Sequence, residues 1–349
     1  MMAPKLNPES NQVRFTDHGT VSIRKFGKLP LRGQWQSCLL LLLLVGGCAA
    51  DFGPRQPANF ILDNAHVSGT SVAFNTDSAI LASGGFEGDI QLTGVADGKA
   101  ITRLHAHQGA VNGMAFLDAA QLASVGYDGR IAVWDISGKL LRDKQTPSPI
   151  SYMVLSAQSQ VIVTGHKDGA VRVWRLPDLT LAHEYRVHGS EVRSVAWHGP
   201  SGRLASSGND GRVFAWTANT APVELSKAPS DAASLQFSPD GRTLMGGGWF
   251  KLLRWDVASG ALETIPTQHH GLINSLRYTD DGKTLATVSR HTDSAVYFLD
   301  ATSGAVLRRF QAHDLCGADI ALSPDSRYLA TTSDDTSVRL WDLRLPPKR

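Results

Sequence analysis

The sequence predicts an all-β protein built from a repeated antiparallel unit. The chain has 349 residues, 33 of them glycine, and its Val, Ile, Thr and Ser residues recur in short runs bounded by Asp-Gly, Pro-Asp and Ser-Gly. Runs of this kind between turn residues are typical of short strands. Since the length exceeds the usual size of a single core, we expect two domains or one fold that grows by repetition.

A unit of about 40 residues recurs seven times. The stretch GRIAVWD, residues 129–135, has counterparts at 169–175, 211–217, 250–256, 294–300 and 337–343, and a weaker one, GDIQLTG, at 88–94. Within each copy, apolar and polar residues alternate in short runs divided by turns, which predicts about four antiparallel strands. The anchor positions are 39 to 44 residues apart and are Thr93, Trp134, Trp174, Trp216, Trp255, Leu299 and Trp341.

These repeats resemble the WD-repeat β-propeller family over residues 59–345. The resemblance implies a seven-bladed β-propeller of four-stranded antiparallel blades. In that family a His, a Ser or Thr, an Asp and a Trp form a hydrogen-bonded tetrad, which stabilises a fold only when every member is satisfied. By resemblance, three blades carry full tetrads: His107, Ser124, Asp128 and Trp134 in blade two, His188, Ser206, Asp210 and Trp216 in blade four, and His313, Thr331, Asp335 and Trp341 in blade seven.

The other four blades depart from this pattern, so we expect packing to hold them. Blade three has prolines where the His belongs, blade six has Leu299 in place of the Trp, and blade five has Trp249 at the position of the turn Asp. The tetrad positions that remain are Thr164, Asp168 and Trp174 in blade three, His269, Thr287 and Asp293 in blade six, and His66, Ser83 and Glu87 in blade one.

The two ends of the repeat region predict how the ring closes. The stretch NFILD, residues 59–63, precedes His66 as an outer strand precedes the His of other copies, whereas the last copy ends after its third strand near Leu343. We therefore expect the N-terminal strand to complete the last blade, which removes an exposed edge.

An apolar run near the N-terminus has the features of a secretory signal. It extends for about ten residues from Cys38 to Gly47, while a membrane-spanning helix needs about 20. Basic residues precede it and small residues end it, as in a signal peptide. An uncleaved signal anchor and a core strand are the alternatives.

The end of this run, Val45-Gly46-Gly47-Cys48, resembles the lipobox of bacterial lipoproteins. The resemblance implies cleavage before Cys48 and lipidation of its thiol, and Ala49 after it favours the periplasmic face of the outer membrane. We expect a signal peptide at 1–47, whose long basic region at 1–36 suggests a start further downstream. The lipidated Cys and a tether would occupy 48–58, the propeller 59–345 and a tail 346–349.

No motif in the sequence predicts catalysis, a metal or a cofactor. Gly282-Lys283-Thr284 resembles the end of a phosphate-binding loop, but Arg277 stands where that loop needs glycine. Cys-x-x-Cys-His and His-Glu-x-x-His are both absent. A net charge of +2 without a dense Lys/Arg block argues against nucleic acid as a partner.

The turns between the second and third strands supply a candidate binding face. The residues before the turn acid should surround the central channel and mix aromatic side chains with charges of both signs, which suits a protein partner. An aromatic pair in blade five could add an interface anchor or fill space left by the missing tetrad. The predicted face comprises Phe86, Tyr127, Lys167, Asn209, Trp249, Phe250, Thr292 and Asp334.

We therefore expect a monomeric, non-catalytic scaffold that is lipid-anchored in the bacterial cell envelope and binds envelope proteins. One alternative is a periplasmic enzyme or redox accessory protein, because the turns at 256–262 and 300–306 resemble those of quinone-binding propellers. The Trp that follows the Gly in such turns is missing from both. The other alternative is an outer-membrane assembly factor.

Overall fold

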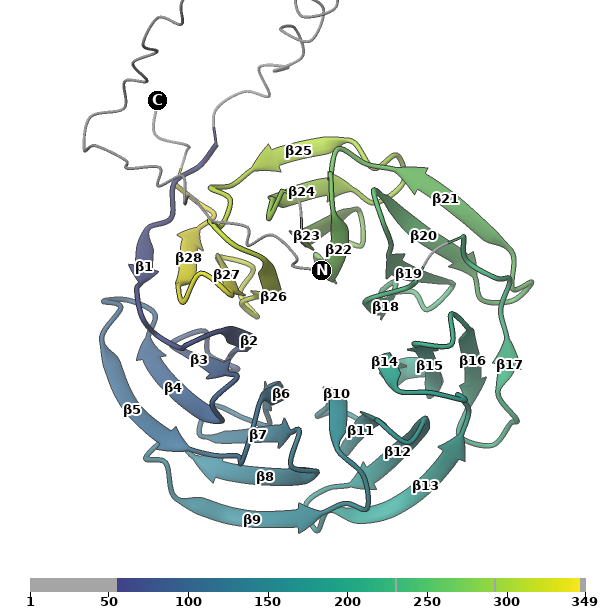
Figure 1. Ribbon diagram of the computed structural model, residues 1–349, viewed down its shortest axis with the longest axis horizontal. Helices are drawn as coiled ribbons and strands as arrows, with labels where there is room; N and C mark the ends of the chain where they lie inside the picture. Colours follow the sequence, from purple (N-terminus) through teal and green to yellow (C-terminus); the bar gives the residue numbers. More distant parts are fainter. Residues whose placement is uncertain (1–54, 230, 292, 346–349) are drawn as a thin grey trace, which may run out of the picture. The chain divides into compact units, whose positions relative to one another are not determined.

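Seven sheets of four strands each surround a central channel. The computed structural model describes residues 55–229, 231–291 and 293–345, which form 28 strands and one 3-10 helix, η1 (Gly199–Ser201). In every sheet, neighbouring strands pair antiparallel, and one strand edges the channel while the fourth lies at the periphery (Figure 1). The predicted seven-bladed β-propeller is confirmed.

Blades one to four follow the chain without a break. Their strands are β2 (Gly69–Phe74), β3 (Ile80–Gly85), β4 (Asp89–Gly94) and β5 (Ala100–His105); β6 (Val111–Phe116), β7 (Gln121–Gly126), β8 (Arg130–Asp135) and β9 (Leu140–Gln145); β10 (Ile150–Ser156), β11 (Val161–His166), β12 (Ala170–Arg175) and β13 (Thr180–Arg186); and β14 (Val192–His198), β15 (Arg203–Gly208), β16 (Val213–Thr217) and β17 (Val223–Glu224).

Blades five to seven continue the ring, and the last one also takes a strand from the start of the described chain. Their strands are β18 (Leu235–Phe237), β19 (Thr243–Gly247), β20 (Lys251–Asp256) and β21 (Leu262–Pro266); β22 (Leu272–Tyr278), β23 (Thr284–Arg290), β24 (Val296–Asp300) and β25 (Val306–Arg309); and β26 (Gly317–Leu322), β27 (Tyr328–Ser333), β28 (Val338–Asp342) and β1 (Phe60–Leu62).

The hydrophobic core lies between blades. In blade two, the middle strands β7 and β8 are buried along almost their whole length, whereas the outer strand β9 is mostly exposed. Trp134 packs with Ala73 and Leu92 of blade one, and Trp174 packs with Val125 and Ile131 of blade two. Each blade therefore buries its apolar surface only when its neighbour is present, which favours a closed ring.

Strand β1 closes the ring as predicted. Phe60 pairs with Leu340, and the Asp342 amide donates to the Asn59 side chain at 2.6 Å. Gln56 is also part of the fold, since it is 3% exposed and bridges to Phe310. The folded region thus begins ahead of residue 59, inside the segment expected to be a tether.

Several predictions from the sequence fall outside the described residues. These are the signal peptide at 1–47, the lipidated Cys48, most of the tether and the tail at 346–349. Within the described part of the chain, no helix is long and apolar enough to cross a membrane.

Candidate functional site

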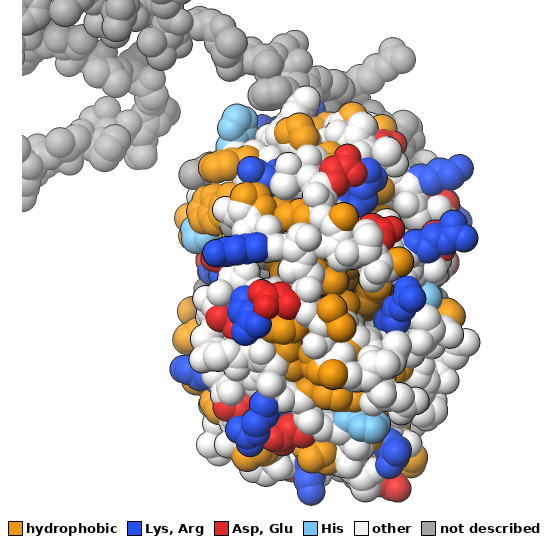
Figure 2. Space-filling model, turned by 90° about the vertical axis from the view of Figure 1, so that its right-hand side faces the viewer, with side chains coloured by type: hydrophobic (Ala, Val, Ile, Leu, Met, Phe, Trp, Pro, Cys, Tyr) orange, Lys and Arg blue, Asp and Glu red, His pale blue; other side chains and the backbone are white. Residues whose placement is uncertain are grey.

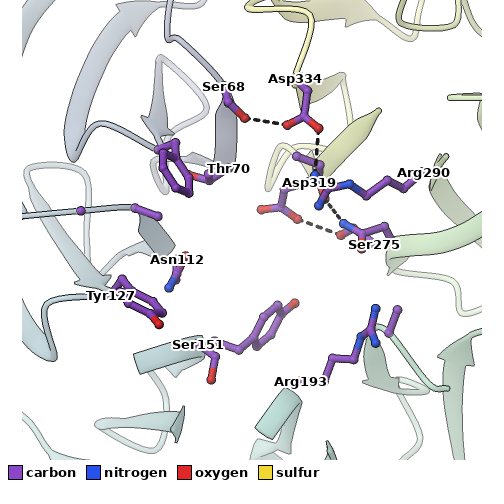
Figure 3. A pocket seen from close by; sticks show the side chains of 18 of the residues that line it. Ser68, Thr70, Asn112, Tyr127, Ser151, Arg193, Ser275, Arg290, Asp319 and Asp334 are labelled. Carbon is purple, nitrogen blue, oxygen red and sulfur yellow. Dashed lines mark hydrogen bonds and ion pairs between the residues drawn. The ribbon is translucent and has the colours of Figure 1, made fainter. Parts of the chain in front are cut away.

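A cavity of about 710 Å³ opens at the mouth of the central channel (Figure 3). It lies on the face that carries the turns between the second and third strands, because Phe86, Tyr127 and Asp334 from three such turns line it. Phe86 is 66% exposed and Tyr127 is 43% exposed, so both rings are available to a partner.

A β-bulge near the start of the innermost strand shapes this cavity. The register of the first two strands shifts around one extra residue in six of the seven blades. A bulge re-aims a side chain that regular pairing would place elsewhere. In this protein all six bulged residues line the cavity, and they are Thr70, Asn112, Ser151, Arg193, Asn274 and Ala318. Sequence analysis missed them, because alternation alone does not show where the register shifts.

Three bulged side chains also link neighbouring blades. The Thr70 hydroxyl donates to the Val111 carbonyl at 2.6 Å, and the Asn112 amide donates to the Ile150 carbonyl at 2.7 Å. Asn274 makes the equivalent bond to the Ala318 carbonyl at 2.6 Å. These bonds hold the innermost strands at a fixed spacing, so the cavity wall is preorganised.

Two acids that line the cavity, Asp319 and Asp334, are paired within the protein. Asp334 accepts hydrogen bonds from Ser68 at 2.6 Å and from Arg290 at 2.8 Å (Figure 3). Asp319 accepts a bond from Ser275 at 2.8 Å and lies 3.3 Å from the Arg277 guanidinium. With aromatic faces beside these paired charges, the cavity offers the mixed contacts typical of a protein interface.

The remaining residues of the predicted face are only partly brought together. The Lys167 ammonium contacts the Tyr127 hydroxyl and lies 4.9 Å from the centre of that ring, so it borders the cavity. Asn209 is exposed but does not line the cavity, and Thr292 lies outside the described residues. Trp249 and Phe250 do not line it either, so the predicted single ring divides into two surfaces.

The tetrad of blade two has the arrangement that the family resemblance implies. His107 Nε2 lies 2.8 Å from the Ser124 hydroxyl, its Nδ1 lies 3.1 Å from Asp128, and the Trp134 indole donates to Ser124 at 2.9 Å. Since the carboxylate accepts only, Nδ1 carries the proton and the hydroxyl donates to Nε2. Burial opposes ionisation of Asp128, but the bonds from His107 and from the Gln108 amide lower its pKa to about 2.

The predicted tetrads of blades four and seven lack the tryptophan bond. The His188–Ser206 distance is 2.8 Å, but the Trp216 indole nitrogen is buried with no hydrogen-bond partner among the described residues. Its ring instead meets Tyr185 edge-on, with centroids 5.3 Å apart.

In blade seven, the Trp341 indole donates to the Gln56 carbonyl at 3.1 Å. The Trp341 indole therefore bonds to the closing segment of the chain and not to the Thr331 hydroxyl. Thr331 keeps its 2.7 Å bond to His313.

Blade three contains a histidine that sequence analysis did not assign. His166 is fully buried at the end of β11, with Nε2 2.8 Å from the Thr164 hydroxyl and Nδ1 3.1 Å from the Ser148 carbonyl. The Trp174 indole donates to Thr164 at 2.8 Å. A histidine two residues after the Thr, rather than one in the preceding loop, thus completes the network. Asp168 is left to pair with Arg172.

Blades one and six keep the imidazole–hydroxyl bond. His66 lies 2.9 Å from Ser83, and His269 lies 2.9 Å from Thr287. Blade five has Gly246 at the hydroxyl position, where an added Cβ would lie 2.9 Å from the Trp255 ring. The indole fills that space and donates to the Ser226 carbonyl at 2.8 Å.

Comparison with known proteins supports the WD-repeat propeller. The model of the WD domain, G-beta repeat, matches residues 98–135, 138–175, 179–217 and 304–342. Periodic tryptophan protein 2 of Arabidopsis thaliana is 24% identical over 61% of this chain and 24% of its own length. For human Striatin-4 the identity is 23%, over 69% of this chain and 36% of its own.

WD repeat-containing protein 55 of Arabidopsis thaliana is 19% identical over 78% of this chain and 79% of its own length. The chain thus spans about a quarter to a third of the first two relatives, and all three are eukaryotic. No group of three or more His, Cys, Asp or Glu side chains placed to hold a metal ion occurs among the residues that the structure describes.

The buried His166 predicts a loss of stability in acid. Burial and the nearby Arg172 lower its pKa from 6.5 to about 4, so the unfolded chain binds the proton more tightly than the folded one. Its stabilising contribution is complete above pH 6.5 and falls by about 3 kcal/mol as the pH drops to 4. Urea unfolding of the wild type and of His166→Gln at pH 7 and pH 4 measures this. If both proteins lose stability in parallel, His166 keeps its ordinary pKa in the fold.

Proposed function

We propose that this WD-repeat propeller is a non-catalytic scaffold that docks partner proteins on the channel-mouth face. The observation that carries the proposal is the preorganised cavity, in which exposed aromatic rings stand beside two acids, Asp319 and Asp334, that are already paired within the protein. A protein surface can match such a mixture with apolar side chains and neutral hydrogen-bonding groups. WD-repeat propellers are in general scaffolds of this kind, which supports the same conclusion.

The distribution of surface charge favours a protein partner over nucleic acid. Figure 2 shows basic and acidic side chains interspersed on one side of the molecule, with apolar side chains between them. Several of the basic groups are neutralised locally, as Arg254 is by Glu263 at 2.5 Å and Arg130 is by Asp143 at 2.7 Å. A nucleic-acid-binding surface would instead present a continuous basic stripe.

The proposal also includes a lipid anchor at Cys48 and a place in the bacterial cell envelope, on the periplasmic face of the outer membrane. Its support is the lipobox-like VGGC sequence behind a short apolar run and a basic segment. Two or more acyl chains hold a protein stably at a membrane without a spanning helix. In this setting the propeller would bind envelope proteins close to the bilayer.

Site-specific crosslinking tests the docking face. A photoreactive residue in place of Tyr127 should yield discrete crosslinked partners, whereas the same group in place of Leu181, on the outer strand β13 and 47% exposed, should not. Tyr127→Ala should weaken capture of those partners about tenfold, because a central aromatic ring is a common interface anchor. Equal adducts at both positions, or unchanged capture by Tyr127→Ala, would remove the proposed face.

Metabolic labelling with a clickable fatty acid tests the anchor. The wild-type protein should incorporate the label and sediment with membranes, because its thiol accepts the lipid. Cys48→Ser should remain unlabelled and uncleaved, while Cys316→Ser serves as a control that keeps the label. Persistent labelling of Cys48→Ser would contradict lipidation at this position.

A further inference from the structure

The central channel has a second mouth, on the face that carries the turns between the first and second strands. A cavity of about 490 Å³ opens there, and all seven innermost strands line it (Figure 1). Each strand contributes a large apolar residue at or next to its last position: Phe74, Phe116, Leu155, Trp197, Phe237, Tyr278 and Leu322. Those of blades three, four, six and seven are only half-buried, so apolar side chains meet solvent at this mouth. Exposed apolar surface of this kind marks a contact site.

Two further hollows extend this mouth across blades five and six. The first, of about 260 Å³, shares Trp197, Phe237 and Tyr278 with the mouth. The second, of about 280 Å³, is lined by residues 238–240 of one turn and 281–282 of the next. Tyr278 lines all three, so they adjoin one another, and together we call them the opposite groove. A hollow that continues along the surface suits a peptide segment of another chain.

Three carboxylates line the opposite groove. Asp280 lines the mouth and the first hollow, while Asp240 and Asp281 line the second. Asp240 and Asp281 each accept a 2.6 Å bond from the hydroxyl two residues earlier in the turn, and Asp280 accepts from Ser326 at 2.9 Å. The hydroxyl bonds lower the pKa of Asp240 and of Asp281, so both are ionised at neutral pH. Since these donors are neutral, the negative charge of the groove remains.

The two arginines that line the opposite groove are already paired. The Arg254 guanidinium lies 2.5 Å from Glu263, and that of Arg277 lies 3.3 Å from Asp319. Neither is therefore available to neutralise the three carboxylates of the groove.

The other nearby basic groups leave the charge of the lining negative. Arg242 and Lys283 belong to the two turns but do not line the groove, and the Arg242 side chain is 84% exposed and comes no closer than 3.9 Å to a carboxylate. So exposed and long a pair contributes little. His198 does line the groove, but it donates from Nε2 to the Pro239 carbonyl at 3.1 Å and lies 2.7 Å from the Ser201 hydroxyl, bonds that a neutral ring can make.

The chemistry of the groove discriminates between classes of ligand. Its carboxylates would repel the phosphates of nucleic acid and of anionic lipid headgroups. In the part of the chain that the structure describes, these acids do not form a group placed to hold a metal ion. A peptide that carries both apolar and cationic side chains matches the apolar mouth and the acidic hollows together.

We infer that the opposite groove binds a basic segment of a partner protein, in which Lys or Arg residues flank one aliphatic or aromatic side chain. The apolar side chain enters the mouth beside Trp197 and Tyr278, and the cationic side chains pair with Asp240, Asp280 and Asp281. This goes beyond the proposed docking face, because it adds a second contact surface at the other end of the channel.

The two surfaces can be altered separately. Tyr152 is common to the linings of both cavities, and Arg277 of the opposite mouth pairs with Asp319 of the channel-mouth cavity, so this pair lies at their boundary. Tyr127 lines one cavity, whereas Asp280 lines the other. Substitutions at these two positions therefore report on different faces.

A heptapeptide phage library panned against the full-length chain tests the inference. Recovered peptides should include a group with Lys or Arg beside one apolar residue. These should bind Asp280→Asn/Asp281→Asn about tenfold more weakly than the wild type at about 50 mM salt, where exposed charges are weakly screened. Asparagine keeps the shape and an acceptor oxygen and removes the charge. Recovery of acidic or uncharged peptides alone, or equal affinity for the double variant, would overturn the inference.

The matched control is Asp325, which occupies the turn position of Asp281 in blade seven. It accepts the same 2.6 Å bond from a hydroxyl two residues earlier but does not line the groove. Asp325→Asn should bind the peptides as the wild type does, and a loss equal to that of the double variant would contradict the groove. Ala157→Lys, which breaks no turn bond and adds a cation at an exposed position of the mouth, should weaken the same peptides by about threefold.

Tyr127→Ala, measured with the same peptides, separates this inference from the proposed function. Basic peptides that bind Tyr127→Ala normally but lose affinity with Asp280→Asn/Asp281→Asn support the opposite groove, whatever happens at the channel-mouth face. If every recovered peptide loses affinity with Tyr127→Ala and none with the groove variants, the proposed docking face stands and the opposite groove is wrong.

Discussion

A hydrogen bond between a buried imidazole and a buried hydroxyl is the interaction on which the blades depend. It occurs in six of seven blades, with distances of 2.7 to 2.9 Å. The tryptophan and aspartate bonds of the tetrad, by contrast, are present in some blades and absent from others. In five blades the bond joins the second strand to the loop that precedes the first strand. It lies in a low-dielectric environment, where leaving either polar group without a hydrogen bond destabilises the fold. Blade three keeps it with a histidine from a different position, which shows that the contact matters more than the sequence motif.

Because this bond and the packing between blades fix the scaffold, the turn tips are free to differ. Phe86 and Tyr127 expose aromatic rings on turns whose acids, Glu87 and Asp128, remain tied to their histidines. Blade five has lost the bond, and the Trp255 indole fills the space at Gly246 instead. The turn of the same blade carries Phe250, which is half exposed. The bonds that stabilise each blade and the docking surface that we propose thus lie in different layers of the blade.

The repeat period and the turn chemistry predicted seven copies of a unit of about four strands. The resemblance to the WD-repeat family implied the seven-bladed propeller, and the two ends of the repeat region predicted the closing strand. Local pattern could not predict which donor meets which acceptor. Trp341 bonds to Gln56, which is 285 residues away in sequence, and Trp216 meets Tyr185 rather than a hydroxyl. His166 was missed because its position differs from the repeat consensus. The bulged residues that line the cavity were missed because a register shift leaves no mark on apolar alternation.

Two adjacent threonines in β27 allow the central claim to be measured directly. Both side chains are fully buried, but Thr331 bonds to His313 at 2.7 Å, whereas the Thr332 hydroxyl has no hydrogen-bond partner among the described residues. Valine at either position keeps the shape and removes the hydroxyl. The free energy of unfolding should fall by about 1–3 kcal/mol in Thr331→Val, which leaves the imidazole nitrogen unpaired, and should stay level or rise in Thr332→Val. Equal unfolding free energies for the two variants would contradict the account.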